Sequence, residues 1–186
     1  MSQLNYPDNT HYRLPRKNVF VLSCMDLRLL DNLLLFLHHD NLANRYDHFV
    51  LAGASLSASN QNHFLFKKDI LEKYNDFEHW KKNLSEHIQL AIDLHDIRDV
   101  YIVEHQDCGA YHYFVDRSDL ALILEEKEYQ YKSSKQLADT ISYKQYKKVK
   151  ITDKQETIEE YYNLNVHCFH IDLRGNVELM YTTASS

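Results

Sequence analysis

Two short apolar runs in this chain each end abruptly at residues that commonly bind metals. The run 19–22 is followed at once by Ser23 and Cys24, and the run 100–103 is followed by the cluster 104–109, which contains His105 and Cys108. Runs of this length, rich in valine and isoleucine, predict buried strands. Ligands bind beyond the carboxyl ends of the strands in open α/β sheets. We therefore expect both clusters to lie at one edge of such a sheet.

The rest of the chain alternates helical and strand patterns. We expect strands over residues 18–23, 47–52, 99–104, 164–173 and 177–181, and helices over 29–39, 63–82 with a break near 75–76, 84–95, 110–126, 134–148 and 152–162. Alternation of this kind predicts an α/β fold of three layers, with a mostly parallel central sheet covered by helices. We expect the strand order 2-1-3-4, with the hairpin around Gly175 adding an antiparallel fifth edge strand.

Length and composition favour one folded domain. Of the 186 residues, 44% are hydrophobic and 12% aromatic, which is typical of a globule with a sizeable core. Residues 1–17 hold both prolines and no periodic apolar pattern, so we expect an N-terminal arm there and a single α/β domain over 18–186. Helix 29–39 is apolar nearly all round, which indicates burial on more than one side, as at a subunit interface or beneath a second layer.

Charge and cysteine content exclude several classes of function. The net charge of −6 disfavours binding to nucleic acids and anionic membranes, and no apolar run approaches the length of a membrane span. The N-terminus lacks the basic and apolar regions of a signal peptide, so we expect a cytoplasmic protein. Three cysteines make a disulfide framework improbable and favour metal or catalytic thiolates at Cys24 and Cys108, with Cys168 a small core residue.

Cys24 from the first strand end, with His105 and Cys108 from the second, makes three zinc ligands. Three protein ligands leave a fourth position open, which is typical of catalytic rather than structural zinc. A thiol redox enzyme that uses Cys24 is the weaker alternative, because the chain has no Cys-x-x-Cys pair.

Taken together, Cys24-x-Asp26-x-Arg28 and His105-x-x-Cys108-Gly109 resemble the zinc signature of the β-class carbonic anhydrases. The resemblance continues through residues 91–110 and the final hairpin. It implies a Zn²⁺ ion bound by Cys24, His105 and Cys108 in a zinc lyase (carbonate dehydratase). The implied reaction is the reversible hydration of carbon dioxide to bicarbonate by a zinc-bound hydroxide. It also implies a homodimer or a higher homo-oligomer.

The resemblance gives catalytic roles to Asp26 and Arg28. Asp26 would accept a hydrogen bond from the bound hydroxide, and Arg28, on the same side of an extended segment, would hold that carboxylate with two hydrogen bonds. In members of the family the matching aspartate also occurs as a fourth zinc ligand, and the sequence leaves both states open. His38, His39, His48, His63 and His112 are candidates for moving protons, and the pattern selects none of them.

The chain departs from the family pattern in two places near the site. The family usually has Arg-Asn before the Ala-Gly that follows the second strand, whereas this chain has Val50-Leu51 before Ala52-Gly53, and Glu104 replaces a usual glycine before the zinc histidine. Two alternatives therefore stay open. The same fold and zinc site would act on carbonyl sulfide or carbon disulfide, or the protein would be a non-catalytic zinc-binding domain.

Overall fold

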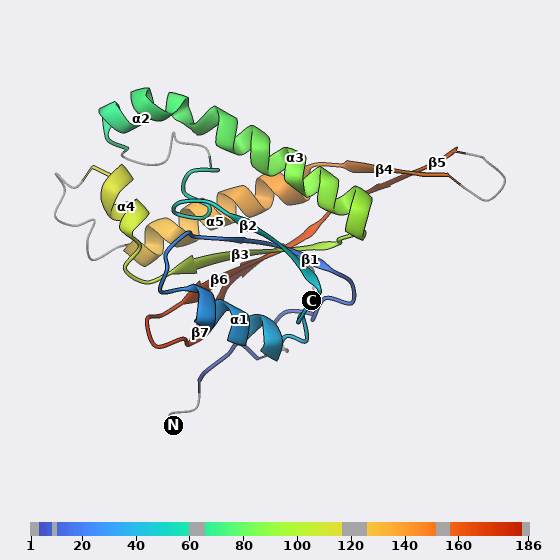
Figure 1. Cartoon of the computed structure of the whole chain (residues 1–186), viewed down its shortest axis with the longest axis horizontal. Helices are drawn as coiled ribbons and strands as arrows, with labels where there is room; N and C mark the ends of the chain where they lie inside the picture. The colour runs from blue at the N-terminus through green and yellow to red at the C-terminus, as the bar shows by residue number, and fades with distance from the viewer. Residues whose placement is uncertain (1–3, 9–10, 60–65, 117–125, 152–156, 184–186) are drawn as a thin grey trace.

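The computed structural model describes residues 4–8, 11–59, 66–116, 126–151 and 157–183 (Figure 1). The chain forms β1 (Val19–Ser23), α1 (Leu30–His39), β2 (Tyr46–Val50), α2 (Lys68–Tyr74), a 3₁₀ turn η2 (Asn75–Phe77), α3 (Glu78–His95), β3 (Asp99–His105), α4 (Gly109–Phe114), α5 (Glu126–Tyr143), β4 (Tyr146–Ile151), β5 (Thr157–Tyr162), β6 (Asn165–Ile171) and β7 (Val177–Thr182). No helix within these described ranges combines the length and the apolarity needed to cross a membrane.

The central sheet has the order β2-β1-β3-β6-β7. Strands β2, β1, β3 and β6 pair in parallel, and β7 returns antiparallel to β6 at the edge. The predicted α/β class is confirmed, and so is the predicted order, because β6 and β7 are the expected fourth and fifth strands. The register pairs Ser23 of β1 with Val103 of β3, so the residues that follow these strands emerge side by side.

Helices cover both faces of this sheet, as the period-two pattern of its strands requires (Figure 1). Phe20 and Leu22 of β1 belong to the core cluster that includes the buried residues of α3 and α5. Val19 and Val21 point to the other face, into the cluster that includes α1. Strand β3 lies in the middle and is buried along its whole length. The result is the expected three-layer arrangement, with the candidate metal ligands at the carboxyl ends of the buried strands β1 and β3.

The expected break in the helical region 63–82 is confirmed. Asn75, Asp76 and Phe77 take left-handed backbone angles, with φ values of 47°, 52° and 56°, and separate α2 from α3. Helix α3 begins at Glu78, earlier than the position near Leu84 from which the amphipathic pattern is clear. The part of the prediction that covers residues 63–65 lies outside the described residues.

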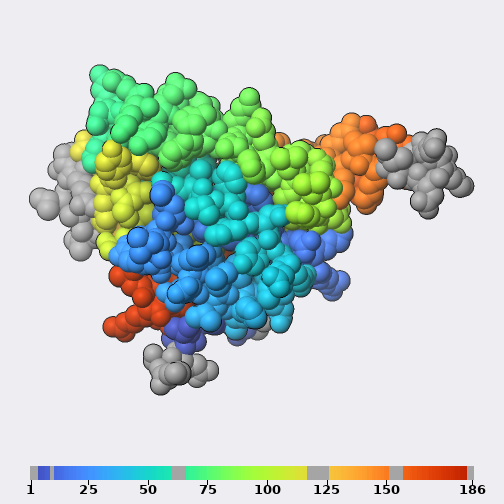
Figure 2. Space-filling view, in the orientation of Figure 1, coloured from blue at the N-terminus to red at the C-terminus, as the bar shows by residue number. Residues whose placement is uncertain are grey.

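The predicted helix over 134–148 is wrong from residue 144 onward, and the predicted helix over 152–162 is wrong over its described part, 157–162. Helix α5 ends at Tyr143, and residues 146–151 and 157–162 form the antiparallel pair β4–β5, which stands apart from the central sheet (Figure 2). This lysine-rich stretch has helical propensity, but pairing with β5 makes it a strand. Its residues alternate accordingly, since Tyr146 and Lys148 are buried and Lys147 is exposed. Tyr146 is buried in the core, and the ammonium of Lys148 donates to the carbonyl of Ile92 at 2.9 Å near the end of α3. Residues 152–156 lie outside the described part of the chain.

The predicted helix over 110–126 is also shorter than expected. Helix α4 ends at Phe114, because Val115 takes an extended conformation and pairs with Phe66. Residues 117–125 lie outside the described residues, and Glu126 begins α5.

The N-terminal arm packs against the rest of its own chain. The Tyr12 hydroxyl donates to both carboxylate oxygens of Asp40, at 2.9 and 2.8 Å, and the Tyr101 hydroxyl donates to the same buried carboxylate at 2.8 Å. Further out, the amide of Val177 donates to the carbonyl of Asn5 at 2.8 Å. These contacts hold the arm against the C-terminal end of α1 and the first residue of β7.

Candidate metal centre

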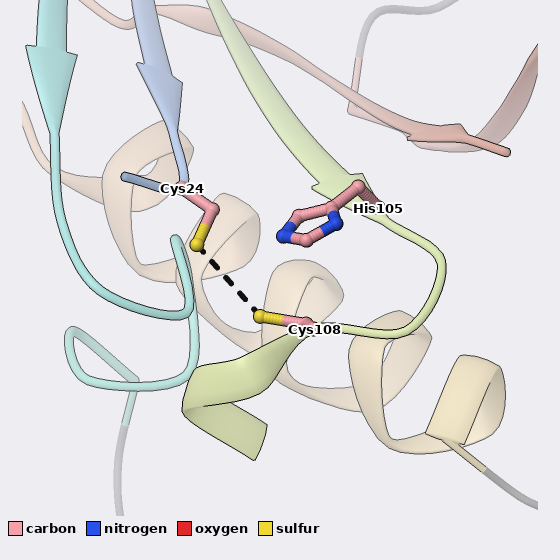
Figure 3. A group of neighbouring side chains, drawn as sticks. All are labelled: Cys24, His105 and Cys108. Carbon is pink, nitrogen blue, oxygen red and sulfur yellow. Dashed lines mark hydrogen bonds between the residues drawn. The ribbon is translucent and has the colours of Figure 1, made fainter. Parts of the chain in front are cut away.

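The three predicted zinc ligands converge at the carboxyl ends of β1 and β3 (Figure 3). Cys24 follows β1, His105 ends β3, and Cys108 lies immediately before α4. Their ligand atoms lie within 4.8 Å of one another, and all three side chains are buried. Residues far apart in sequence are therefore brought to one point by parallel pairing of the two strands, as the sequence predicted.

The spacing of these atoms suits a zinc ion. The sulfur atoms of Cys24 and Cys108 lie 3.7 Å apart. Two Zn–S bonds of about 2.3 Å at a tetrahedral angle place their sulfurs about 3.8 Å apart. Two thiolates and an imidazole are also the donor types that zinc prefers in proteins. The residues present therefore fit this metal in both geometry and chemistry.

His105 is oriented for coordination by a backbone carbonyl. Its Nδ1 atom lies 3.0 Å from the carbonyl oxygen of Gln106, which only accepts hydrogen bonds, so Nδ1 carries the proton. Its Nε2 atom is buried and has no hydrogen-bond partner among the described residues. A buried nitrogen without a partner is costly unless a ligand occupies its lone pair. The same pattern, with one ring nitrogen anchored and the other free, is characteristic of metal-binding histidines.

A backbone amide supports the thiolate of Cys24. The Gly53 amide donates to the Cys24 sulfur at 3.3 Å. The pKa of Cys24 is lowered, first by the hydrogen bond that it accepts from Cys108 and then by His105 and this amide. Gly53 has a φ of +74°, and a Cβ added there would lie 3.2 Å from the Cβ atoms of Ala110 and Leu56. Glycine therefore lets the loop approach the metal site closely.

Asp26 and Arg28 form a bidentate ion pair beside the three ligands. The Arg28 guanidinium donates from Nε to Oδ1 of Asp26 at 3.0 Å and from Nη2 to Oδ2 at 2.8 Å. The sequence left open whether Asp26 is a fourth ligand or a partner of Arg28, and in this structure it is the partner. Its Oδ2 atom lies 4.0 Å from Nε2 of His105. The hydrogen bonds from Arg28 lower the pKa of Asp26 to about 2, so this carboxylate is ionised at neutral pH.

Arg28 also reaches the loop that carries Cys108. Its Nη1 atom donates to Oδ2 of Asp107 at 3.0 Å, and its Nη2 atom donates to the carbonyl oxygen of the same residue at 2.8 Å. Asp107 itself has a left-handed backbone, with φ of +56°. Arg28 thus fixes the carboxylate of Asp26 relative to the loop that presents Cys108.

Helix α5 contributes supporting residues that sequence reasoning missed. The carboxylate of Glu126 accepts from the amide of Cys108 at 2.7 Å and from the amide of Asp107 at 3.2 Å. Gln130, one turn further along, donates to the carbonyl of His105 at 2.7 Å. The sequence offers no clear signal for them. The buried stripe Leu137, Ala138 and Ile141 continues backward at helical spacing through Gln130, Ser133 and Ser134, but polar residues at these positions predict an exposed face.

Glu104, one of the two departures from the family pattern, contacts the loop that follows the other departure, Val50-Leu51. Glu104 is fully buried, and its Oε1 atom accepts from the amide of Ser55 at 3.0 Å. The Ser55 hydroxyl pairs with that of Ser133 at 2.7 Å, and the Tyr111 hydroxyl pairs with Ser133 at the same distance. Burial raises the pKa of Glu104 to about 8. This buried network joins the loop after β2 to β3, α4 and α5.

The histidines proposed for proton transfer lie in different places. His112 pairs through Nε2 with Oδ1 of Asp107 at 3.2 Å, close to Arg28, and His48 lies 2.7 Å from the Ser23 hydroxyl. His39 pairs with Asp40 at the far end of α1. His63 lies outside the described residues.

Comparisons with known proteins reveal limited relationships. No family model matches the chain. An uncharacterised protein of Rickettsia bellii (strain RML369-C) is 30% identical over 115 residues, which are 62% of each protein. An uncharacterised protein of Rickettsia conorii (strain ATCC VR-613 / Malish 7) is 27% identical over 113 residues, which are 60% of this chain and 53% of that protein. The chain thus matches less than two thirds of the length of either relative.

Among solved structures, the chain is similar to a carbonic anhydrase from Glaciozyma antarctica, with 13% identity, a TM-score of 0.45 and coverage of 91% of this chain and 86% of that one. It is also similar to β-carbonic anhydrase isoform I from Trichomonas vaginalis, with 13% identity, a TM-score of 0.44 and coverage of 99% and 89%. None of these matches identifies a family for the chain.

Proposed function

We propose that this protein is a zinc-dependent carbonic anhydrase that interconverts carbon dioxide and bicarbonate. The observation that carries the proposal is the combination of three convergent ligands with an adjacent ion pair. Cys24, His105 and Cys108 present their ligand atoms within 4.8 Å of one another, and Nε2 of His105 is buried without a partner. The Asp26 carboxylate lies 4.0 Å from that nitrogen. A purely structural metal site has no need of such an oriented carboxylate.

Cys24, His105 and Cys108 would hold the zinc ion. When bound in a site with an open position, zinc provides a nucleophile near neutral pH by acidifying water. Because two thiolates offset the charge of the metal, we expect a less acidic water than at an all-histidine site, and activity that rises with pH. The amide of Gly53 and the carbonyl of Gln106 hold the thiolate and the imidazole in their orientations.

Asp26 would position the reacting water. As an ionised carboxylate it accepts a hydrogen bond but donates none, so it fixes a neighbouring hydroxyl group with a lone pair free to attack. Arg28 holds both carboxylate oxygens of Asp26 and is itself anchored to Asp107. Asp26 thus acts on the reacting water, and Arg28 acts through Asp26 as a positioning residue.

We also propose that the protein functions as a homodimer or a multiple of one. Helix α1 buries Leu33, Phe36 and Leu37 against the sheet but leaves Leu30 and Leu34 49% and 40% exposed. Leu27, just before this helix, is 91% exposed. A second copy that buries this apolar face beside Arg28 would explain it. Light scattering on the wild-type protein and on Leu30→Glu/Leu34→Glu tests this proposal, and a wild-type monomer would contradict it.

The cytoplasmic location and the division into arm and domain stay predictions.

Stopped-flow measurement of carbon dioxide hydration on zinc-loaded protein, from about pH 6.5 to about pH 9, tests the activity. We expect a rate well above that of Cys24→Ser and an increase with pH. Cys168→Ser, which alters a buried cysteine outside the site, is the matched control and keeps its activity. Absence of hydration in fully zinc-loaded protein would overturn the proposal. Assays of the same sample with carbonyl sulfide and carbon disulfide then separate a different small substrate from a non-catalytic zinc domain.

A further inference from the structure

We propose that a cationic cavity at the amino ends of β1, β3 and β6 binds the phosphate group of a small phosphorylated molecule. This cavity has a volume of about 510 Å³. It lies at the opposite edge of the sheet from the metal centre, which is at the carboxyl ends of β1 and β3. The inference does not depend on the proposed carbonic anhydrase activity.

The wall of the cavity carries a local excess of positive charge. The arm contributes Arg13, Arg16 and Lys17, and Arg98 is the residue immediately before β3. The one carboxylate in the described lining is Asp99, whose side chain is 11% exposed. Four cations therefore surround the cavity against a single acid, in a chain whose net charge is −6.

The two arginines of the arm have guanidinium groups available for a ligand. Among the described residues, no hydrogen bond or ion pair involves the side chain of Arg13 or of Arg16. By contrast, Lys17 and Arg98 both pair with Asp96, and Arg98 also stacks on the ring of Tyr162. An incoming anion would therefore form its ion pairs with Arg13 and Arg16. Planar guanidinium groups recognise phosphate oxygens with paired hydrogen bonds.

A buried histidine adds a second, independent indication of a ligand. His167 lines the cavity and is 1% exposed, yet its Nε2 atom has no hydrogen-bond partner among the described residues. Its Nδ1 atom is engaged at 2.9 Å by the hydroxyl of Thr182. The nearest carboxylate oxygen to Nε2, on Asp99, lies 3.6 Å away, beyond a normal hydrogen bond. Nε2 itself has almost no accessible surface, so a phosphate oxygen in the cavity would become its partner only when the ring moves toward the cavity.

The arm presents these groups on a fixed backbone. Tyr12 is anchored to Asp40, and Pro15 is buried. On the other side, Arg45 donates to the carbonyl of Lys17 at 2.9 Å. The segment that carries Arg13 and Arg16 is thus held on both sides. A site whose donors are already in place loses little conformational entropy when it binds.

The size and charge of the cavity favour a small molecule over a polymer. A volume of this order matches ligand pockets for cofactor-sized molecules. A nucleic acid would meet the repulsion of a chain with a net charge of −6 beyond the cavity itself. We therefore assign the site to a phosphate or diphosphate group carried by a small molecule.

Isothermal titration calorimetry with inorganic pyrophosphate and with ADP, at constant ionic strength, tests the assignment. We expect saturable binding to the wild-type protein and at least a tenfold higher Kd for Arg13→Ala/Arg16→Ala. The matched control is Lys68→Ala/Lys82→Ala, which removes the same charge from side chains that are 91% and 77% exposed on α2 and α3. Its Kd should stay within twofold of the wild-type value.

A second measurement follows the ring nitrogens of His167 by ¹⁵N NMR during the same titration. Saturable shifts with the calorimetric Kd would support the site. No saturable binding, or equal loss in both double variants, would overturn it. So would binding of a single-stranded RNA that exceeds that of both small molecules and depends on Arg13 and Arg16, because the occupant would then be a polymer.

Discussion

The buried carboxyl group of Glu104 accepts a hydrogen bond from the backbone amide of Ser55 at 3.0 Å. Glu104 immediately precedes His105, and Ser55 lies two residues after Gly53, whose amide supports Cys24. One contact therefore connects the strand that carries the imidazole to the loop that supports the first thiolate. Glu104 therefore links two segments that each hold a residue of the candidate metal centre.

The first prediction concerns this contact. Glu104→Leu should lower the free energy of unfolding by about 1–3 kcal/mol, because it leaves the buried amide of Ser55 without an acceptor. Glu104→Gln keeps an acceptor in the same place and should cost less. Urea denaturation of the zinc-loaded proteins measures both. Equal losses for the two variants would show that the hydrogen bond to Ser55 contributes nothing.

The second prediction concerns the metal. Purified protein should contain about one zinc per chain, and Cys24→Ser should lose most of it, because two ligands hold zinc far more weakly than three. Cys168→Ser should keep the full amount, since this buried cysteine contacts the carbonyl of Ser134 rather than the site. Elemental analysis measures the content. Chelation should lower the melting temperature of the wild type and of Cys168→Ser, and leave that of Cys24→Ser unchanged.

The third prediction separates positioning from metal binding. Arg28→Lys should lower the turnover of carbon dioxide by at least about tenfold, because a lysine cannot hold both oxygens of Asp26 and reach Asp107 as well. Zinc content should not change. Arg174→Lys, at an exposed arginine of the last hairpin, is the control. Loss of zinc in Arg28→Lys would instead give this residue a structural role.

The fourth prediction concerns acid stability. Burial lowers the pKa of His170 to about 4, from an ordinary value of 6.5. The unfolded chain binds this proton more readily, so the neutral imidazole supports the fold above about pH 6.5, and that contribution is lost as the pH falls through about 4. His170→Gln should reduce the loss of stability between these values by on the order of 2 kcal/mol. Urea midpoints of metal-free wild type and variant, across this range, test it, and identical pH profiles would contradict it.

The fifth prediction concerns the arm. Tyr12→Phe removes one of the two tyrosine hydroxyls that donate to the buried Asp40 carboxylate, so it should lower the free energy of unfolding by about 1.5–3 kcal/mol. Tyr143→Phe alters a tyrosine that is 82% exposed and should have little effect. Chemical denaturation compares the two. If both variants match the wild type, the arm does not depend on this contact.

The sequence predicted the parts of the fold that depend on local pattern. Strands β1 and β3, helix α1 and the candidate ligands Cys24, His105 and Cys108 follow from apolar runs and the residues that end them, and the structure brings these three side chains together. Strands β4 and β5 were missed because Lys147, Lys148 and Lys150 favour a helix as readily as a strand, and only pairing with β5 decides between them.

The supporting residues of the site escaped prediction for a different reason. Glu126 and Gln130 act by contacts with backbone atoms of residues 105–108, and such contacts depend on how α5 packs rather than on any motif. The state of Asp26 likewise depends on the geometry around Arg28, which spacing alone leaves undetermined.

The ligand set also has a consequence for how the protein folds. Cys24 and Cys108 are separated by 84 positions in sequence and meet only after β1 and β3 have paired in parallel. Such nonlocal pairing forms slowly, because a long loop must close before any contact stabilises it. The nascent chain therefore cannot assemble the candidate zinc site until the centre of its sheet exists. Metal binding would then be a late step of folding, and zinc would stabilise a fold that has already formed rather than initiate its formation.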